Sequence, residues 1–331
     1  MSDGDRRPPF YLGIDLGGTN IKSGVVDDLG RPVSSISIAT HAELGPEIGL
    51  KSLAEAGRLA VCASGLDWDK IEMVGLGTPG TMDIAAGLLI DPPNLPGWVN
   101  FPVRQLLEEE LGKPVVFQND ANAAVYGEFW VGAGRGVRSV AMLTLGTGIG
   151  CGVVEEGRIV EGRHSHGAEC GHVVVQLEGG RICSCGAEGH LEAYASATAV
   201  VRRAIEAIED EPGSSLYNLY QGGELTSRAI NEAAEAGDRL ARRLMKETAR
   251  YLAVGAANLM HTFDPDLILF GGGMIAAGRT FLDDIRREIP RFALPIPATR
   301  TRVEFALLGG DAGFIGAAGC ARLAHRDINN L

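Results

Sequence analysis

Short apolar segments with the spacing of strands alternate with longer segments of helical periodicity along the whole chain, and this alternation predicts an α/β protein. In the first half, two strands flank a glycine turn, and prolines between 92 and 102 indicate an irregular loop. One helix is expected over 47–63, and another begins near Asp120. The strands expected in this half are 10–15, 21–27, 31–39, 73–77 and 115–117.

The second half repeats the opening pattern, because a strand, a glycine turn and a returning strand come at 139–155 as they do at 10–27. This repetition predicts two lobes of similar topology. The strands expected in this half are 139–145, 151–155, 158–160 and 267–270. The helices expected are 190–208, 226–262 and 313–324.

Length and charge limit the classes of function that the chain can have. It has 331 residues, enough for two domains, and 30 Lys and Arg against 42 Asp and Glu give a net charge of −12. Because a negative field repels phosphate backbones, we expect no nucleic-acid partner. Residues 1–9 lack the apolar stretch of a signal peptide, and no apolar run is long enough for a membrane span. We therefore expect a cytoplasmic protein without a membrane partner, whose cysteines are thiols or metal ligands.

Three glycine-rich turns are candidates for phosphate binding. Such turns let backbone N–H groups approach an anion without hindrance from Cβ, although an ordinary tight hairpin is the alternative for each turn alone. Their spacing fits neither a dinucleotide fingerprint nor a Walker A motif. Two turns could hold the phosphates of one nucleotide and the third could give access to its base, which resembles actin, hexokinase and the heat-shock-70 ATPase. Asp15 could hold hydrated Mg²⁺. The residues expected to bind the nucleotide are Asp15, Gly17, Gly18, Thr19, Gly146, Thr147, Gly148, Gly271, Gly272 and Gly273.

Four soft ligands close together in the sequence predict a metal site. Cys183 and Cys185 lie between His172 and His190. Two thiolates and two imidazoles can close a tetrahedral zinc site, and such a site has no open position, so the zinc would be structural. Scattered cysteines and histidines without a metal are the alternative. We assign the other cysteines to packing; they are Cys62, Cys151, Cys170 and Cys320.

Motifs in order along the chain resemble the ROK (repressor, open reading frame, kinase) family of sugar kinases, and within it the bacterial glucokinases. The resemblance runs from about residue 10 to residue 324. The motifs that carry it are Asp15-Leu-Gly-Gly-Thr19, Gly77-Thr-Pro-Gly80, Pro93-Asn-Leu-Pro-Gly-Trp98, Asn119-Asp-Ala-Asn-Ala-Ala124, Leu145-Gly-Thr-Gly-Ile-Gly150, Glu169-Cys-Gly-His172 with the cysteine cluster, and Gly310-Asp-Ala-Gly-Phe-Ile-Gly-Ala-Ala318.

The resemblance implies a two-lobed, actin-like (ribonuclease H-like) α/β ATPase fold with an active-site cleft between the lobes. Residues 1–118 and 311–331 would form the small lobe, closed by the C-terminal helix. Residues 119–310 would form the large lobe, with the zinc motif and the nucleotide-binding turns.

The resemblance also implies an enzyme, a glucokinase that transfers a phosphoryl group from ATP with Mg²⁺ to the 6-hydroxyl of glucose. Asp120 would be the catalytic base, whereas the residue type alone at a helix start more often indicates an N-cap. Without the motif, Glu169 and Glu192 would be surface acids. The implied sugar-binding residues are Asn94, Asn119, Asp120, Glu169, His172 and Glu192. The implied zinc ligands are His172, Cys183, Cys185 and His190, with His190 in place of the third cysteine of the family.

Other functions within and outside the kinases stay open. The substrate could be N-acetylmannosamine, N-acetylglucosamine, mannose, fructose or allose, and polyphosphate could replace ATP. A sugar-sensing ROK regulator would need a helix-turn-helix module before Asp15, where we expect no room for one. An actin relative would need neither the cysteine cluster nor the Asn119–Asp120 pair. Members of the family are commonly dimers or tetramers, so the resemblance implies a homodimer or homotetramer. It also implies a hexose and ATP as the small-molecule partners.

Overall fold

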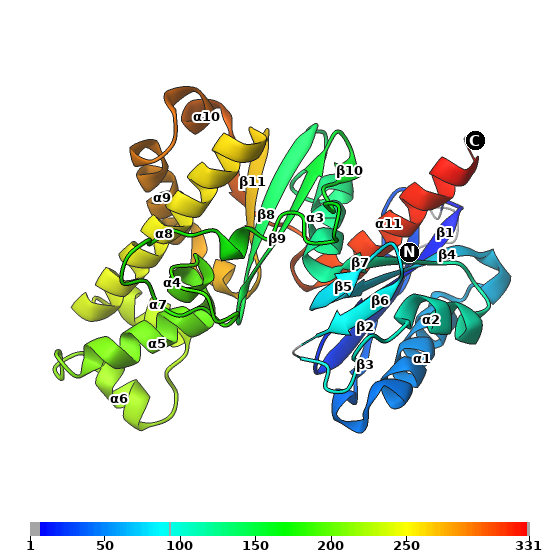
Figure 1. The fold of residues 1–331 in the computed structure, drawn as a ribbon, viewed down its shortest axis with the longest axis horizontal. Coiled ribbons are helices and arrows are strands. Elements are labelled where there is room, and N and C mark those ends of the chain that lie inside the picture. Colours follow the sequence, from blue (N-terminus) through cyan, green and yellow to red (C-terminus); the bar gives the residue numbers. More distant parts are fainter. Residues whose placement is uncertain (1–6, 93, 330–331) are drawn as a thin grey trace. The chain divides into compact units, whose positions relative to one another are not determined.

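A computed structural model of the chain describes residues 7–92 and 94–329, and these fall into two compact units. The first unit consists of the described parts of Met1–Val137, Gly152–Ala168 and Leu307–Leu331. The second consists of Arg138–Cys151 and Glu169–Ala306. Each unit combines a sheet with helices (Figure 1), so the α/β prediction is confirmed.

The first unit is built on a five-stranded sheet in the order β3-β2-β1-β4-β7. β1 pairs antiparallel with β2 across the first glycine turn, whereas β1, β4 and β7 run parallel. A separate two-stranded ribbon of β5 and β6 follows β4. The strands are β1 (Phe10–Leu16), β2 (Asn20–Asp27), β3 (Ile36–Ala39), β4 (Ile71–Thr78), β5 (Thr81–Asp83), β6 (Leu88–Asp91) and β7 (Val115–Asn119).

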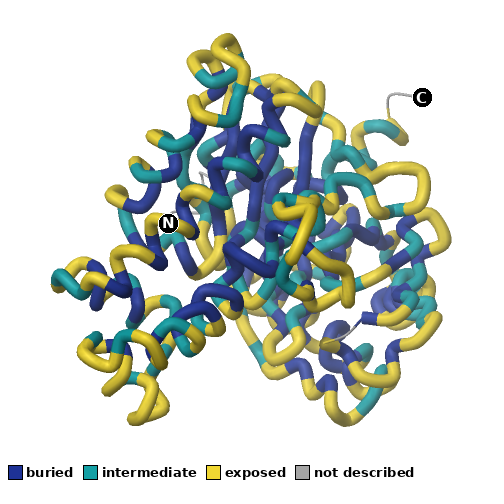
Figure 2. Tube along the Cα trace, turned by 60° about the vertical axis from the view of Figure 1, so that its left-hand side comes forward, coloured by how far each residue is buried: buried dark blue, intermediate teal, exposed yellow. Residues whose placement is uncertain are grey.

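Helices cover both faces of this sheet because its strands carry apolar residues on both sides. On one face α1 (Pro46–Ser64) and α2 (Val103–Leu111) enclose a core that includes Leu12, Ile14 and Leu76. On the other face α3 (Asp120–Val131) and α11 (Ala312–Asn329) pack on each other, and α11 lies against β1 and β4. In Figure 2 the buried residues gather in the interior and the exposed ones lie on outer helical turns.

The second sheet has the order β10-β9-β8-β11-β12. Its strands β8, β11 and β12 belong to the second unit and run parallel, while β9 continues along the chain from the second unit into the first. The strands are β8 (Ser139–Leu145), β9 (Ile149–Glu155), β10 (Arg158–Ile159), β11 (Leu267–Gly271) and β12 (Arg302–Phe305).

The helices of the second unit are organised around α8, which packs against α4, α5, α7, α9 and α10. Asp238 caps α8, since its side chain accepts a hydrogen bond from the backbone N–H of Ala241. These helices are α4 (Glu192–Ala195), α5 (Ala197–Ile208), α6 (Ser215–Gln221), α7 (Ser227–Glu235), α8 (Arg239–Phe263), α9 (Gly278–Glu288) and α10 (Pro295–Arg300).

Three predicted elements are shortened or broken by local features of the sequence. The strand expected over 31–39 begins at Ile36, because Pro32 has no N–H for the ladder and the Asp27 carboxylate accepts from the backbone N–H of Arg31. The helix expected over 190–208 is broken at Ser196, whose side chain caps α5. The helix expected over 226–262 is broken between α7 and α8, where Gly237 has a φ of 106°.

The compact units have other bounds than the lobes predicted from the family resemblance, 1–118 with 311–331 and 119–310. Contacts group α3 with the first unit, because α3 packs along α11. The segment Gly152–Ala168 also belongs to the first unit, and the last segment of that unit begins at Leu307.

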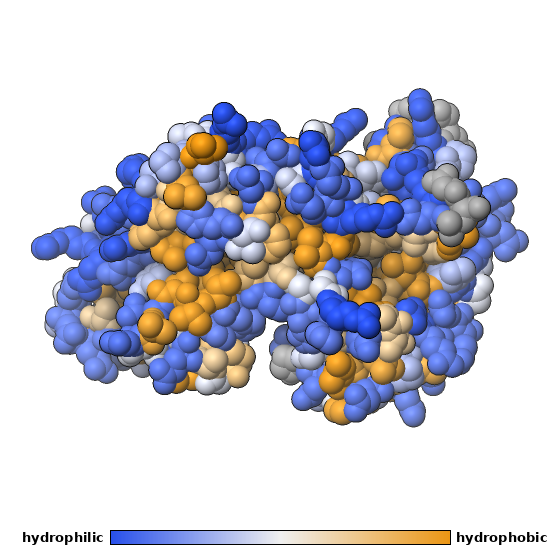
Figure 3. Space-filling view, turned by 45° about the horizontal axis from the view of Figure 1, so that its top comes forward, coloured by the Kyte–Doolittle hydropathy of each residue, from blue (hydrophilic) through white to orange (hydrophobic). Residues whose placement is uncertain are grey.

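Hydrophilic and hydrophobic side chains are interspersed on the face drawn in Figure 3. Among the described residues, none of the helices has the length and apolar character needed to cross a bilayer.

Candidate active site

In the first unit the candidate residues meet at one edge of the sheet, where the parallel strands β1, β4 and β7 end. Asp15 is in register with Gly77, and Thr78 is in register with Asn119. Carboxyl ends of parallel strands lie at the same edge, which is where ligands bind in open α/β sheets. The fold therefore brings together three motifs that are spread over about a hundred residues of the sequence.

The first glycine turn lies against the loop that carries Asn94. The turn is closed by a hydrogen bond of 2.9 Å from the Gly17 N–H to the Asn20 carbonyl. A Cβ on Gly18 would lie 3.2 Å from the carbonyl oxygen of Asn94 and 3.3 Å from its Cβ, so glycine permits this close approach. Asn94 itself is exposed. The neighbouring Pro93 lies outside the described residues, so the first position of that motif is not placed.

Trp98 anchors the same loop. Its indole is fully buried, and its ring lies 4.9 Å from that of Phe101 in an edge-on arrangement. A Cβ on Gly49 of α1 would lie 2.3 Å from the indole, so α1 comes close to this ring. The role of Trp98 is therefore packing.

Asn119, and not Asp120, caps α3. The Asn119 Oδ1 accepts from the backbone N–H groups of Ala121 at 2.9 Å and Asn122 at 3.2 Å. Asp120 occupies the first helical position, and its Oδ1 accepts from the Ala121 N–H at 2.8 Å. The N-cap interpretation of Asp120 is thus wrong, because its neighbour already fills that place.

The environment of Asp15 is unfavourable for a charged carboxylate. Burial and the nearby charge of Asp120 raise the pKa of Asp15 to about 7, and Lys22 lowers it in part. Lys22 is opposite Asp15 in the β1–β2 register, but its ammonium group is 2.5 Å from the Asp311 carboxylate and donates to the Gly310 carbonyl at 3.0 Å. Two carboxylates close together at a partly buried edge are a suitable arrangement for a divalent cation.

The second unit has a similar arrangement at the carboxyl ends of β8 and β11. Thr144 is in register with Gly271, so the turn at 146–150 and the glycines at 271–273 lie at the same edge. A Cβ on Gly272 would lie 2.5 Å from the carbonyl oxygen of Leu145, so the two segments are in backbone contact. Thr147 is exposed at the tip of its turn.

A cavity beside these glycines is a feature that the sequence analysis did not predict. It has a volume of about 150 Å³ and is lined by residues of α7, by Met245 of α8 and by Gly273, Met274, Ala276 and Ala277. A neighbouring hollow of about 590 Å³ continues between α7, α8 and α9. Of the residues that line the smaller cavity, Gly273 alone belongs to a motif predicted from the sequence, and the remaining lining arises from the packing of helices.

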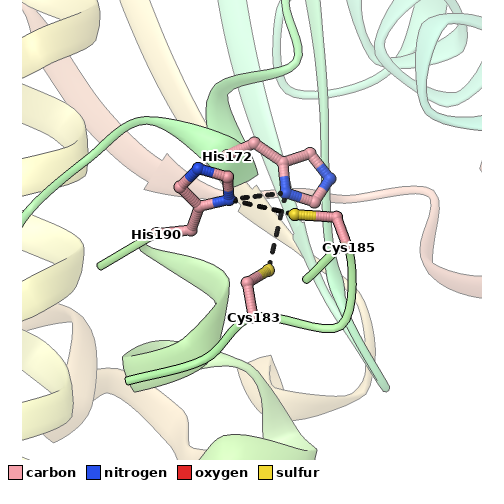
Figure 4. Close-up of side chains that lie close together, drawn as sticks. All are labelled: His172, Cys183, Cys185 and His190. Atoms are coloured by element: carbon pink, nitrogen blue, oxygen red, sulfur yellow. Dashed lines mark hydrogen bonds between the residues drawn. The ribbon is translucent and has the colours of Figure 1, made fainter. Parts of the chain in front are cut away.

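The predicted metal ligands come together in the second unit (Figure 4). The ligand atoms of His172, Cys183, Cys185 and His190 all lie within 4.8 Å of one another. The two Nδ1 atoms are 3.3 Å apart, Cys183 Sγ is 3.6 Å from the His172 Nδ1, and Cys185 Sγ is 3.3 Å from the His190 Nδ1. Tetrahedral zinc would place two nitrogens about 3.3 Å apart, and a nitrogen and a sulfur about 3.6 Å apart. The donor set and its spacing fit a zinc ion.

Glu192 connects the loop that carries Cys183 and Ser184 with the glycine turn at 146–150. One carboxylate oxygen accepts from the Ile149 N–H at 2.9 Å, and the other accepts from Ser184 Oγ and from Cys183 Sγ. Although burial alone would raise the pKa of Glu192, these hydrogen bonds lower it below its ordinary value. Glu192 is therefore not a freely solvated surface acid. Glu169 is exposed and precedes the short 3₁₀ helix Cys170–His172.

The assignment of the other cysteines to packing is confirmed in part. Cys151 and Cys320 are buried and Cys170 is half-buried, but Cys62 is exposed on α1, so that assignment was wrong for Cys62. Its position on the outer side of an amphipathic helix explains the difference.

Comparisons with known proteins agree with this arrangement. The model of the ROK family matches residues 11–324. A protein of Halalkalibacterium halodurans named glucokinase is 38% identical over 93% of this chain and 93% of its own length. The structure of a ROK hexokinase from Thermus thermophilus has a TM-score of 0.82 and 37% identity, and covers 96% of this chain and 99% of that one.

A third relative was solved with ligands. It is a ROK family glucokinase from Streptomyces griseus in complex with glucose and AMPPNP, with a TM-score of 0.78 and 36% identity over 95% of this chain and 99% of that one. These matches confirm the actin-like kinase fold expected from the motifs. With its strand-end motifs, its Cys/His cluster and a family match over nearly its whole length, this chain belongs to the ROK family.

Proposed function

We propose that this protein is an ATP-dependent glucokinase, which transfers the γ-phosphoryl group of ATP to the 6-hydroxyl of glucose and releases ADP. The observation that carries the proposal is the placement of Asn119 and Asp120 where β7 passes into α3, at the same sheet edge as Asp15. Family membership and relatives named glucokinase support the reaction.

Asp120 is proposed as the catalytic base. Phosphoryl transfer requires alignment and charge neutralisation, together with a group that accepts the proton of the attacking hydroxyl. Asp120 is the first residue of α3, so its carboxylate is held on a rigid element next to the Asn119 cap. It would remove the proton from O6 as the bond to phosphorus forms.

Amide, carboxylate and imidazole groups are the proposed sugar ligands. Asn94 and Asn119 come from the first unit, and Glu169, His172 and Glu192 from the second. The Asn119 Oδ1 is engaged by α3, so Asn119 would donate from its Nδ2. Glu192 accepts from Ile149 and Ser184, which fixes the direction of its carboxylate. Such preorganised groups discriminate between hydroxyl patterns because an unmatched group would be left unpaired.

The nucleotide would be held by the three glycine turns. Phosphate contacts are proposed for the backbone of Gly17, Gly18 and Thr19, and for the backbone of Gly146, Thr147 and Gly148. The glycines at 271–273, next to the cavity lined by α7 and α8, would contact the ribose and base. Asp15 would hold Mg²⁺, which neutralises phosphate charge when bound.

We propose a structural zinc ion for the four-ligand cluster. His172 presents Nδ1 to the cluster and its other ring nitrogen points away from it (Figure 4). That second nitrogen would be available for the sugar. A four-coordinate ion has no open position for water, so its contribution would be to fix the loop that carries His172 and contacts Glu192.

The test is ADP release with a panel of hexoses and N-acetylhexosamines, and with ATP or polyphosphate as the phosphoryl donor. We expect glucose and ATP to give the highest kcat/KM. Asp120→Asn should still bind glucose in calorimetry but lose at least about 10²-fold in kcat, the scale of a lost general base. Asp69→Asn makes the same change at an exposed position of the first unit and should behave as the wild type. Near wild-type turnover in Asp120→Asn, or a stronger response to another sugar, would contradict the proposal.

A further inference from the structure

We infer that Gln118 is a positioning residue for the reaction, because its side-chain amide joins the Asn119–Asp120 pair to Glu161 and thereby fixes the direction of the Asp120 carboxylate. This inference rests on the proposed function of Asp120. No motif in the sequence singles out Gln118 or Glu161.

Gln118 lies on β7 immediately before the pair, and its side chain is only 2% exposed. Its Oε1 accepts two hydrogen bonds, from the backbone N–H of Asn119 at 2.8 Å and from the Nδ2 of Asn122 at 3.0 Å. Its Nε2 donates to the Glu161 Oε1 at 2.8 Å. The amide therefore contacts the strand end, the first turn of α3 and the segment that follows β10.

The Glu161 end of this connection has a further contact, whereas the Asn122 end depends on Gln118. The Glu161 carbonyl accepts from the Gly167 N–H at 2.7 Å, which closes the loop at 162–166. Asn122 is buried, and among the described residues its Oδ1 has no hydrogen-bond partner. The Nδ2 bond to Gln118 is thus what orients the Asn122 side chain in the first turn of α3.

An amide is the group that satisfies all three contacts. It offers an acceptor and a donor in one plane, whereas a carboxylate only accepts and an apolar side chain does neither. At 2% exposure an unmatched group is not compensated by water. Replacement should therefore displace Asn119 and, with it, Asp120, and a displacement of about 1 Å near reacting atoms costs about 10²-fold in rate.

The test exchanges the donor and the acceptor. Gln118→Glu keeps the shape and both accepted bonds but removes the donor and places two carboxylates side by side. We expect kcat to fall by about 10-fold or more, with the glucose KM changed by less than about 3-fold. The double variant Gln118→Glu/Glu161→Gln restores a donor at position 161, so kcat should return to within about 3-fold of the wild type.

A matched control exists on α2. Gln105 is exposed and donates to the Glu109 Oε1 at 2.9 Å, so Gln105→Glu makes the same chemical change away from the site and should leave kcat unchanged. If Gln118→Glu does not fold, Glu161→Leu removes the acceptor without adding charge and should lower kcat in the same way.

Hydrogen exchange separates the inference from the proposed function. Amide exchange at 119–122 should quicken in Gln118→Glu and slow again in the double variant, whether or not the wild type phosphorylates glucose. A wild type inactive on every hexose with this exchange pattern would overturn the proposed function alone. A Gln118→Glu variant with wild-type kcat and exchange would overturn the inference, as would a double variant that regains thermal stability but not kcat.

Discussion

The half-buried carboxylate of Asp15 should reduce the stability of the first unit as pH rises, and Asp15→Asn should remove this effect. The pKa of Asp15 is raised from 3.8 to about 7, first by burial and then by the charge of Asp120. The folded protein therefore holds a proton on Asp15 more tightly than the unfolded chain does. The stability that this proton contributes is present below pH 3.8 and is lost as pH rises to about 7.

The size of the effect follows from the shift in pKa. About three pH units at 1.36 kcal/mol each give an upper limit of about 4 kcal/mol. Between pH 5 and pH 8 the loss in the wild type should exceed that in Asp15→Asn by about 1–3 kcal/mol, since part of the titration lies below pH 5. Lys22 does not abolish the effect, because its ammonium group is engaged by Asp311 and the Gly310 carbonyl.

Urea unfolding followed by tryptophan fluorescence measures this effect in the first unit, which contains Asp15. All three tryptophans, Trp68, Trp98 and Trp130, lie in the first unit. As the pH falls from 8 to 5, the free energy of unfolding of the wild type should rise relative to that of Asp15→Asn, until the two values meet or change order. Asp69→Asn should have the pH dependence of the wild type. Parallel pH dependences of the wild type and Asp15→Asn would refute the argument that burial raises this pKa.

Substitutions at three further positions test other parts of the structure. His190→Ala should reduce the zinc content from about one ion per chain to nearly none, and His190→Cys should retain it, since thiolate is an equivalent ligand; wild-type protein without zinc in mass spectrometry would contradict this. Ala168 has a φ of 62°, so Ala168→Gly should stabilise the fold by up to about 1 kcal/mol in urea unfolding, and a loss of stability would argue against strain there. A Cβ on Gly316 would lie 1.6 Å from the Ala123 carbonyl oxygen, so Gly316→Ala should destabilise the first unit by about 3 kcal/mol, and an unchanged urea midpoint would show that α3 and α11 can separate without cost.

The parts of the fold that sequence predicts well are those in which local pattern and tertiary environment agree. The strand at 139–145 has the predicted bounds because residues 140–143 are apolar and a glycine turn follows Leu145. The helices α2 and α9 were not predicted from the sequence, because both are rich in charged residues and bury few side chains. The breaks at Ser196 and Gly237 were missed because helical periodicity continues on both sides of each cap.

In the candidate site, too, the features that a local sequence pattern encodes could be predicted, and those that depend on tertiary contacts could not. The cluster of His172, Cys183, Cys185 and His190 could be predicted because these residues lie close in sequence and their chemistry is specific. The division of roles between Asn119 and Asp120 could not, since either residue type caps helices and only the observed hydrogen bonds show which one does. The cavity beside Gly273 is formed by helices distant in sequence, so no local pattern encodes it.

The C-terminal helix determines the electrostatics of the N-terminal motif. A Cβ on Gly13 or Gly75 would collide with the backbone of α11, and a Cβ on Gly313 would lie 2.1 Å from the Asp15 carboxylate. Small residues at these positions let α11 lie directly on β1 and β4, which buries Asp15 and raises its pKa. A bulkier helix would expose Asp15 to water and lower that pKa. The cost in stability thus comes from the packing of α11 on the sheet, and a divalent cation bound at Asp15 would offset it.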